Sequence, residues 1–440
     1  MDELQSDVIN RLIESGDFVF TCRYWSPLGP CVIWGSTMRL VVVNDVSVVR
    51  GGATKVAIQC LQACVRAAVD CTFLVGDDGT GLEECGLRVP TIALGEKPLR
   101  DGPVIANVFD RHFNKRAYEA LAMLLGQSCE ETVVHVHGWN QILSPSIFHA
   151  LAENRARVIV TAHDFFLNCP NGGRLNYKSG EICPVKPMSF ECLATNCDKR
   201  NYLHKLWRFR RMLGQIGVGD AFWERIEVIL AHEKMEAYLT PGPIRNFQTL
   251  RTPTEPFTWR PTEPWRRERI MFLGRMTWEK GVRTLCEALR MTGQAATLIG
   301  RGPLLEEMRV TLPHCWVPGW LDDASVSELA DQARIFVMPS RMPEPYGLVA
   351  AEAIMSGIPV IISSNALIAD EVEQNGAGLV FKSGDAASLA EALLKVKSDS
   401  LVQKLAEGAR AFGKKIAPSR PEWERRMIAI YTGETAFLAA

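Results

Sequence analysis

Short apolar runs alternate with longer stretches of mixed character along most of this 440-residue chain. The first run, residues 40–43, is wholly apolar and rich in valine, which is typical of a strand buried on both faces of a parallel sheet. A turn at Gly51 and Gly52 follows, and residues 53–69 contain neither Pro nor Gly and favour a helix. Strand, glycine turn and helix are the opening of a doubly wound α/β domain. The same rhythm predicts strands at 71–75, 133–136, 158–161 and 229–230, and a helix at 116–125.

A second series of alternating strands and helices begins after residue 268. Five prolines between Pro241 and Pro261 separate it from the first series and indicate a domain boundary. The pattern predicts strands at 270–273, 296–299, 335–338 and 360–362, and helices at 282–291, 304–309, 350–355, 387–395 and 422–431. The expected parts are an extension at 1–37, a first Rossmann-like domain at 38–252 with a Cys-containing insert at 165–200, a linker at 253–268, a second Rossmann-like domain at 269–412, and a C-terminal helical segment at 413–440 that returns to the first domain. In such an arrangement a ligand usually sits in the cleft between the domains.

Composition narrows the class of protein. With 47% hydrophobic and 22% charged residues and a net charge of −1, the chain is an ordinary globular protein and not a binder of polyanions, so no nucleic-acid partner is expected. No run of 18 apolar residues predicts a spanning helix, and the acidic start does not have the layout of a signal peptide. The 13 cysteines, an odd number, favour a reducing compartment, and the cytoplasm is the predicted location.

Candidate chemistry begins with the segment from Glu344 to Glu352. Prolines and Gly347 keep its first part out of a helix, and a helix is expected from Leu348 onward. Free N–H groups at that helix start form an anion site, and a carboxylate such as Glu352 suits a pair of sugar hydroxyls. Taken alone, the segment fits equally well a solvated loop glutamate followed by a core helix.

Two further strand ends add positive charge and close turns. Gly274 ends the first strand of the second domain, and Arg275 and Lys280 follow on its loop. Ligands of open α/β sheets bind beyond the carboxyl ends of strands, and two cations there suit a diphosphate. The alternative is a pair of exposed surface cations. The sequence Gly300-Arg-Gly302-Pro closes the next strand, which by itself is an ordinary turn.

Together these segments resemble the retaining glycosyltransferases of family 4, which have the two-domain GT-B fold. The resemblance runs in order over residues 38–395. Arg275 and Lys280 fit the family's Arg-x4-Lys pair, and Glu344 and Glu352 fit its Glu-x7-Glu motif with Gly347 at the usual place. Residues 300–303 and 316–320 fit the next two landmarks.

The resemblance implies roles for these residues. Arg275 and Lys280 would hold the donor diphosphate, Glu352 the ribose and Glu344 the transferred sugar. The amides of Leu348 and Val349 would face phosphate or sugar. Val317 would lie beside the nucleotide base, and the glycine turn of the first domain would lie near the donor phosphates, where Thr54 departs from the family's usual Glu. The donor-binding glycines expected on these grounds are Gly51, Gly52, Gly274, Gly302 and Gly347.

Two strand ends of the first domain carry histidines. The sequence Val133-Val-His-Val-His137 puts two histidines on one side of a strand, and we interpret His135 as a packed core residue. His137, nearer the strand end, matches the family's active-site histidine. His163 and Asp164 close the next strand and either contact the acceptor or form a buried pair that holds the loop.

The expected reaction needs no cofactor and no divalent metal. No Asp-x-Asp pair is present to hold a metal-bound diphosphate, so the cations and the helix start would neutralise the leaving group. The family implies retention of configuration, with the departing phosphate oxygen taking the acceptor's proton. His137, Arg275, Lys280 and Glu344 are the predicted catalytic set, with Glu344 as a positioning group.

Two features of the insert region leave alternatives open. Its four cysteines, Cys169, Cys183, Cys192 and Cys197, could bind zinc, but their spacing favours free or packed thiols. Residues 199–213 are basic and aromatic. Read as a helix, they group Tyr202, Leu206, Phe209 and Leu213 on one face, which either rests on the inner face of an anionic membrane or packs on the core with the charges in water.

The predicted function is transfer of a sugar from a UDP- or GDP-sugar to a saccharide or lipid-linked saccharide acceptor in bacterial polysaccharide or glycolipid synthesis. Alternatives are an epimerase or phosphorylase of the same fold and a non-catalytic nucleotide-sugar-binding protein. Arg-x4-Lys combined with Glu-x7-Glu argues against the first two, and the presence of all four residue types argues against the third. An NAD-dependent enzyme would need Gly-x-Gly-x-x-Gly after the first strand, which is absent.

Overall fold

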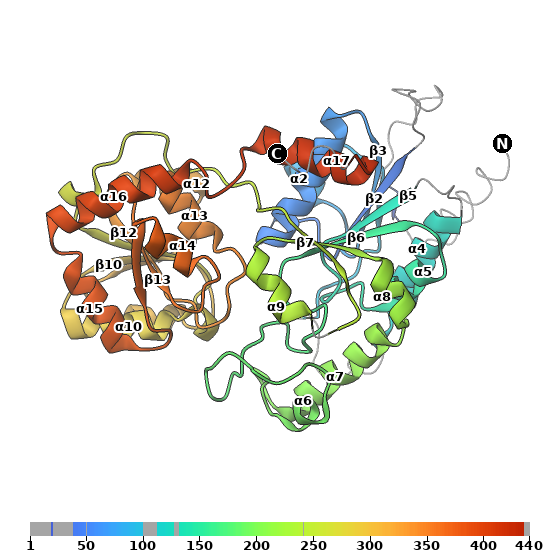
Figure 1. Cartoon of the computed structure of the whole chain (residues 1–440), viewed down its shortest axis with the longest axis horizontal. Helices are drawn as coiled ribbons and strands as arrows, with labels where there is room; N and C mark the ends of the chain where they lie inside the picture. Colours follow the sequence, from blue (N-terminus) through green and yellow to red (C-terminus); the bar gives the residue numbers. More distant parts are fainter. Residues whose placement is uncertain are drawn as a thin grey trace.

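The chain folds into two α/β bodies that lie side by side (Figure 1). The computed structural model describes residues 38–49, 51–99, 112–126, 132–240 and 242–434, together with the short strand β1 (Val19–Phe20). The predicted extension 1–37 lies outside the described residues apart from that strand, as does the end of the C-terminal segment, 435–440.

The first body is built on a sheet with the order β1-β4-β3-β2-β5-β6-β7-β8, in which β1 pairs antiparallel to β4 and the other pairs are parallel. Leaving out β1 and β8, the strands run 3-2-1-4-5-6 in chain order, which is the doubly wound arrangement. The strands are β2 (Arg39–Asn44), β3 (Asp70–Val75), β4 (Thr91–Ala93), β5 (Thr132–Val136), β6 (Arg157–Ala162), β7 (Glu227–Leu230) and β8 (Asn246–Thr249).

The second body repeats this order in an all-parallel six-stranded sheet, β11-β10-β9-β12-β13-β14. The sequence-based prediction of two Rossmann-like α/β domains is therefore confirmed. Its strands are β9 (Arg269–Leu273), β10 (Ala296–Ile299), β11 (Trp316–Gly319), β12 (Ala333–Met338), β13 (Val360–Ser363) and β14 (Gly378–Phe381).

Helices cover both faces of each sheet, which is why the central strands are mostly apolar. In the first body these are α2 (Gly52–Arg66), α3 (Gly81–Glu84), α4 (Lys115–Gly126), α5 (Ser146–Ala152), α6 (Phe190–Ala194), α7 (Tyr202–Ile216), α8 (Asp220–Arg225), η2 (Glu233–Met235) and α9 (Glu236–Leu239). In the second they are η3 (Pro264–Arg266), η4 (Trp278–Lys280), α10 (Val282–Thr292), α11 (Leu305–Thr311), α12 (Asp323–Ala330), α13 (Leu348–Met355), α14 (Ala369–Gln374), α15 (Ala386–Lys395) and α16 (Asp399–Gly413).

The apolar pattern located the central strands and missed four short strands at or next to the sheet edges. β4 and β8 in the first sheet and β11 and β14 in the second were not expected from the sequence. These strands are three or four residues long, and residues of β8, β11 and β14 are partly exposed, so their local pattern is weaker than that of the longer buried strands. Helix α2 ends at Arg66, three residues before the expected end, because residues 67–69 turn the chain into β3.

The proline-rich segment expected to be a linker is packed onto the second domain. Phe257 stacks on Phe336 of β12 with ring centroids 5.0 Å apart. Thr262 Oγ1 donates a hydrogen bond to the carbonyl of Ser356 at 2.8 Å. The chain therefore passes between the domains near Arg251, directly after β8.

The last helix, α17 (Arg420–Thr432), lies against α2 of the first domain (Figure 1). Its Trp423, Met427 and Ile430 are buried in the same cluster as Leu40 and Val42 of β2. The Tyr431 hydroxyl is 2.7 Å from Nδ1 of His135, so the helix also pairs a buried polar group of β5. The far C-terminal end of the chain thus completes the core of the N-terminal domain.

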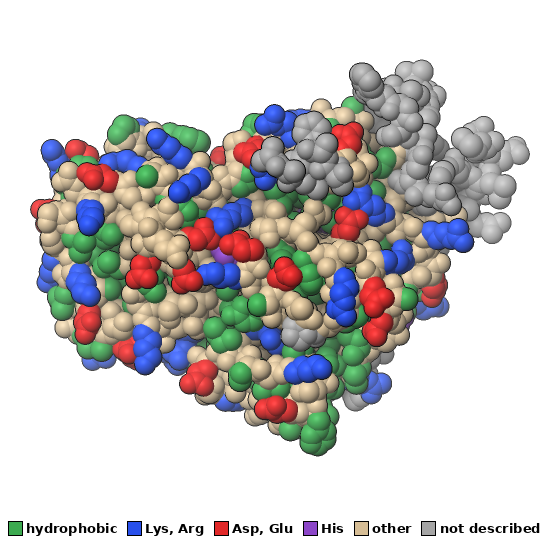
Figure 2. All heavy atoms as spheres, viewed as in Figure 1, with side chains coloured by type: hydrophobic (Ala, Val, Ile, Leu, Met, Phe, Trp, Pro, Cys, Tyr) green, Lys and Arg blue, Asp and Glu red, His purple; other side chains and the backbone are tan. Residues whose placement is uncertain are grey.

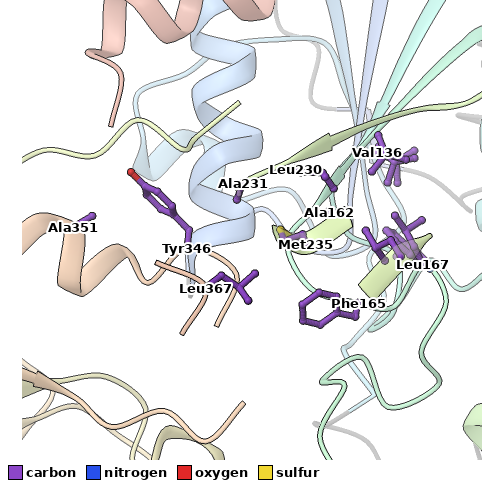
Figure 3. Close-up of a cluster of buried hydrophobic side chains, with 14 of the residues drawn as sticks. Val136, Ala162, Phe165, Leu167, Leu230, Ala231, Met235, Tyr346, Ala351 and Leu367 are labelled. Atoms are coloured by element: carbon purple, nitrogen blue, oxygen red, sulfur yellow. The ribbon is translucent and has the colours of Figure 1, made fainter. Parts of the chain in front are cut away.

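An apolar seam joins the two domains (Figure 3). Tyr346 and Leu367 from loops of the second domain lie next to Ala231 and Met235, which follow β7 of the first. The Tyr346 hydroxyl donates to the carbonyl of Ile416 in the segment that returns to the first domain, at 2.8 Å. The two segments in which the chain passes from one domain to the other therefore lie close to this seam.

Acidic and basic side chains are interspersed over the face drawn in Figure 2. This mixture agrees with the net charge of −1. In the part of the chain that the structure describes, no helix is both long and apolar enough to cross a membrane.

We predict that Trp423→Ala lowers the free energy of unfolding of the first domain by about 3–5 kcal/mol, because a side chain that is 1% exposed would leave a cavity beneath α17. Trp259→Ala is the matched control, since Trp259 is 80% exposed and its loss should change the stability by less than about 0.5 kcal/mol. Urea unfolding of both variants measures the difference. Equal stabilities would show that α17 does not support the first domain.

Candidate functional site

The strand order of each sheet reverses at one point, between β2 and β5 in the first domain and between β9 and β12 in the second. Ligands of doubly wound sheets bind outside the carboxyl ends of the strands at such points. The loops after these four strands and after β6 contain most of the predicted site residues, so the topology provides two half-sites, one in each domain.

Lys280 and Glu344 form an ion pair between the loops that follow β9 and β12. Lys280 Nζ lies 2.7 and 2.6 Å from the two carboxylate oxygens of Glu344, and the Ser340 hydroxyl donates to Oε2 at 3.0 Å. Burial would raise the pKa of Glu344, but Lys280 and Ser340 outweigh it and hold the pKa below its usual value. The carboxylate is therefore ionised and held in one orientation.

The guanidinium of Arg275 is available to a ligand. Arg275 is exposed at the end of β9, and no hydrogen bond or ion pair to its side chain is found among the described residues. Its charge acts on Glu344, whose pKa it helps to lower. An open guanidinium beside a neutralised Lys–Glu pair can receive an anion in bidentate fashion.

Helix α13 begins beside this pair. Gly347 is its N-cap and has a φ of 73°, a conformation that favours glycine, and a Cβ at this position would lie 2.9 Å from Met338 Cε. Within the described residues, no acceptor is found for the amides of Leu348 and Val349. The helix start therefore offers free N–H donors and the positive end of the helix dipole.

Glu352 lies in the second turn of α13, and its carboxylate has no hydrogen-bond or ion-pair partner among the described residues. Burial raises the pKa of its carboxyl to about 7, and Lys55 of α2 acts in the opposite direction. Lys55 belongs to the first domain, so it brings a positive charge toward the second domain's carboxylate. In the sequence, Lys55 follows the glycine turn at Gly51 and Gly52, but no role was predicted for it.

The start of α2 meets the start of α13. A Cβ on Gly52 would lie 3.0 Å from Leu348 Cδ1, so the two domains approach closely where a glycine leaves room. No hydrogen-bond acceptor for the amides of Gly52, Ala53 and Thr54 is found in the described part of the chain. The Thr54 side chain is buried and accepts from Asn44 Nδ2 at 3.3 Å, which makes it a structural residue. With Gly51, this turn places a second set of free amides beside the first.

The loops after β9 and β10 pack backbone against backbone. A Cβ on Gly302 would collide with the Met276 carbonyl, and Gly274 N donates to Ile299 O at 3.0 Å. These glycines thus have a structural reason to be present, whatever they bind. Val317 is buried in the core of the second domain, and its carbonyl accepts from Arg309 Nε at 3.0 Å. Its predicted contact with a nucleotide base stays a prediction.

Three histidines cluster at the ends of β5 and β6. His135 is fully buried, and its two ring nitrogens lie 2.7 Å from the hydroxyls of Tyr431 and Thr161, in accord with a packed core role. His137 Nδ1 lies 3.1 Å from His163 Nε2, while its buried Nε2 has no partner among the described residues. Burial lowers the pKa of His137 well below its usual value and that of His163 to about 4, so both are neutral at pH 7.

Asp164 and Asp45 lie beside this cluster. Asp164 Oδ1 accepts from the Phe166 amide at 2.9 Å, and burial, with a smaller contribution from Asp45, raises its pKa to about 7. The carboxylate of Asp45 accepts from the amides of Gln141, Ile142 and Leu143 and thereby holds the loop after His137. Asp45 was not predicted, although an acid directly after a buried strand is a signal that sequence reasoning can use.

Among the residues that the structure describes, two groups of side chains have ligating atoms close enough to share an ion, within 4.8 Å of one another. They are Cys60 with His135 and His137, and His232 with Glu233 and Glu371. In the first, both nitrogens of His135 already pair with hydroxyls. In the second, Arg251 occupies both oxygens of Glu371. An ion would have to displace these partners.

None of the four insert cysteines belongs to such a group within the described residues. Lys205 Nζ lies 3.3 Å from the sulfurs of both Cys192 and Cys197, where a zinc ion would need to approach them. Cys169 Sγ donates to Asn171 Oδ1 at 3.2 Å, and all four cysteines, Cys183 included, are free. The structure favours packed thiols over a zinc site.

Helix α7 corrects the reading of the basic segment 199–213. Lys205 and Arg211 are buried rather than in water, and Arg211 donates to the carbonyls of Trp139 and Asn140. Leu213, expected on the packed face, is 49% exposed. Arg208 is paired with the buried Asp198 at 3.4 Å. Much of the positive charge that would attract a membrane is therefore buried or paired within the protein. Membrane contact stays a prediction.

Known proteins match part of this chain in sequence. Residues 267–399 match the family model described as "Glycosyl transferases group 1". A glycogen synthase of Mycobacterium tuberculosis is 32% identical over 153 residues, which cover 32% of this chain and 37% of that protein. A GDP-mannose-dependent mannosyltransferase of the same species is 29% identical over 150 residues, 30% of this chain and 39% of that one. The matches thus span less than half of these curated relatives.

Solved structures resemble the whole chain in fold. A sucrose-phosphate synthase from Thermosynechococcus elongatus has a TM-score of 0.66 at 19% identity, covering 91% of this chain and 99% of that one. HepE of Anabaena, solved in complex with UDP, has a TM-score of 0.63 at 13% identity, covering 90% and 100%. The protein therefore has the two-domain Rossmann-like GT-B fold, and its second domain carries the glycosyl transferases group 1 match.

We predict a pH-dependent cost of ionising Glu352. Its pKa is raised in the folded protein, so its contribution to stability is greatest below the unfolded pKa of about 4.5 and is lost as the pH rises toward 7. Between pH 4 and pH 8, wild type should lose about 2–3 kcal/mol of unfolding free energy relative to Glu352→Gln. Urea unfolding at several pH values measures this, with the exposed Glu373→Gln as control. Parallel pH curves for wild type and Glu352→Gln would contradict the prediction.

Proposed function

We propose that this protein is a glycosyltransferase that transfers a sugar from a nucleotide-sugar to a saccharide or lipid-linked saccharide acceptor with retention of configuration. One observation carries the proposal. The Lys280–Glu344 pair, the open guanidinium of Arg275 and the free amides at the start of α13 meet at the strand ends of the domain with the group 1 match. This set combines positive charge for a diphosphate with fixed carboxylates for hydroxyls.

The proposed reaction uses leaving-group stabilisation. Arg275, Lys280 and the α13 amides bind the donor diphosphate and stabilise the negative charge that develops as the bond from the sugar's C1 to the phosphate oxygen breaks. The acceptor oxygen bonds to C1 on the same face, and its proton passes to the departing phosphate oxygen. No divalent metal or cofactor is required in this scheme.

The carboxylates and the histidine have distinct roles. Glu344 is held by Lys280 and Ser340, so it orients the transferred sugar through hydroxyl contacts and does not act as a nucleophile. Glu352 accepts hydrogen bonds from the ribose. The unpartnered Nε2 of His137 faces the sugar from the first domain, and His163 and Asp164 contact the acceptor.

The relatives support a class of donor. One relative's name states GDP-mannose dependence, and one solved neighbour holds UDP, which supports a UDP- or GDP-sugar here. A relative from Erwinia amylovora is named for amylovoran biosynthesis, which supports a role in bacterial polysaccharide or glycolipid synthesis. We propose a cytoplasmic location because of the many unpaired cysteines.

A screen of nucleotide-sugars tests the proposal. Incubation with UDP-, GDP- and ADP-sugars at 100 times the dissociation constant should raise the unfolding free energy by about 2.7 kcal/mol for a true donor. The same donor should be hydrolysed slowly without an acceptor. The free sugars are the control and should have no effect. If no nucleotide-sugar either stabilises the fold or is hydrolysed, the proposal is wrong.

Two substitutions should separate turnover from binding. Lys280→Ala should lower kcat by about 10²-fold or more, because the leaving diphosphate loses a charge and Glu344 loses its partner. Glu352→Ala should weaken nucleotide binding by about tenfold through loss of the ribose contact. Lys404→Ala, an exposed lysine on α16, is the control for charge removal. Full activity in both site variants would contradict the assignment of the site.

A further inference from the structure

The insert that follows β6 reaches across to the second domain. Residues 175–182 form a turn closed by a bridge between Leu175 and Ile182, and Lys199 follows a little later in the chain. In Figure 1 this region is the green loop below α9 that extends toward the second domain. We call residues 175–182 together with Lys199 the strap.

The strap contacts the same loop that carries Arg275 and Lys280. The Tyr177 ring lies 5.6 Å from that of Trp278, centroid to centroid. Lys199 Nζ lies 3.0 and 2.9 Å from the two carboxylate oxygens of Glu279. Trp278 and Glu279 are the two residues directly before Lys280, so both contacts bear on the proposed diphosphate loop.

Arg341 makes a third contact with this loop. Arg341 lies over the Trp278 ring at 4.6 Å from its centroid, and its amide donates to the Glu279 carbonyl at 2.9 Å. A Cβ on Gly180 of the strap would collide with the Arg341 guanidinium. The strap thus closes over Trp278 and Arg341 together, and a glycine permits this approach.

The strap is itself anchored in the first domain. Asn168, at the start of the insert, donates to the carbonyls of Tyr238 and Leu239, and Gln215 of α7 donates to those of Phe166 and Leu167. The Tyr177 amide donates to the carbonyl of Cys197. A contact made by the strap is therefore a contact made by the first domain.

The charge of Glu279 shows what the ion pair does. Its side chain is 6% exposed, and Lys199 is the basic residue within ion-pair distance among the described residues. Burial would raise the pKa of Glu279, but Lys199, with a smaller contribution from Arg275, holds it below the usual value. Without Lys199, a buried carboxylate would remain with Arg275 as the next cation near it. Arg275 would then be drawn from the ligand to Glu279.

We propose that the strap holds the Arg275–Lys280 loop ready for a donor diphosphate, with Lys199 neutralising Glu279 so that Arg275 stays available and Tyr177 fixing Trp278. Lys199 and Tyr177 are positioning residues, since they act through the loop. The identity of the ligand in this inference rests on the proposed function. The contacts and the charge interaction between the strap and the loop do not depend on it.

Lys199→Ala tests the link, with Lys178→Ala as the matched control. Lys178 lies in the strap, is exposed, and its side chain makes no hydrogen bond or ion pair with the described residues. Hydrogen exchange of the peptide covering residues 275–281 should become at least about threefold faster in Lys199→Ala and stay unchanged in Lys178→Ala. Unchanged exchange in Lys199→Ala overturns the proposal, whatever the protein's activity.

Ligand binding tests the charge argument. UDP and GDP, each compared with its monophosphate, are titrated into the full chain. Lys199→Ala should weaken binding of the bound diphosphate by about tenfold and leave its monophosphate within about twofold, because the loop contacts the second phosphate. Glu279→Gln introduced into Lys199→Ala should recover most of that loss, and Lys199→Arg should bind like wild type.

The outcomes separate the two proposals. If wild type binds none of the nucleotides or nucleotide-sugars, the proposed function fails, and the exchange result alone decides on the strap. If wild type binds a diphosphate but Lys199→Ala binds it equally well, the positioning role is wrong and the proposed function stands. If the double variant binds no better than Lys199→Ala, the competition between Glu279 and ligand for Arg275 is overturned.

Discussion

The arrangement of the two domains depends on the hydrogen bonds and the ion pair that join them at Glu371. His232 Nε2 lies 2.7 Å from one oxygen of this carboxylate, and Arg251 donates to both oxygens. Burial would raise the pKa of Glu371, but these partners lower it to about 2, so the carboxylate is ionised across the ordinary pH range. Arg251 and His232 belong to the end of the first domain and Glu371 to α14 of the second. The apolar seam that contains Leu367 also joins the two domains, and both contacts contribute to how the two sets of strand ends meet (Figure 3).

The two carboxylates of the candidate site have opposite shifts in pKa. Glu344 has a lysine and a hydroxyl as partners and is ionised, whereas the half-buried Glu352 has no partner for its carboxylate among the described residues and burial raises its pKa to about 7. Two cations, Arg275 and Lys55, remain without an ion pair among the described residues. Such a site has unsatisfied positive charge and unsatisfied acceptors at once. A ligand that brings both a diphosphate and hydroxyl groups satisfies them together, which is the physical basis of the proposed function.

Sequence reasoning succeeded where the local pattern and the environment agree. The central strands are apolar because helices cover both faces, so runs such as 40–43 and 296–299 identify them directly. It failed for β8 and β11, whose residues are partly exposed at sheet edges, and for α7, where apolar residues were assumed to face inward. In α7 Phe209 and Met212 are buried, but Lys205 and Arg211 are buried beside them, because thiols and loop carbonyls supply partners that no local pattern encodes.

The chain's sequence by itself determined the two doubly wound domains and the motif residues, because strand burial, glycine turns and charged strand ends are local properties. Only the tertiary structure decided which of those residues meet. It paired Lys280 with Glu344, left Arg275 open, and brought Lys55 and the start of α2 to α13 from more than 290 positions away. It also placed Lys199 on Glu279. These contacts arise from how two separately formed sheets are held against each other, and interactions at such sequence distances leave no periodicity to read.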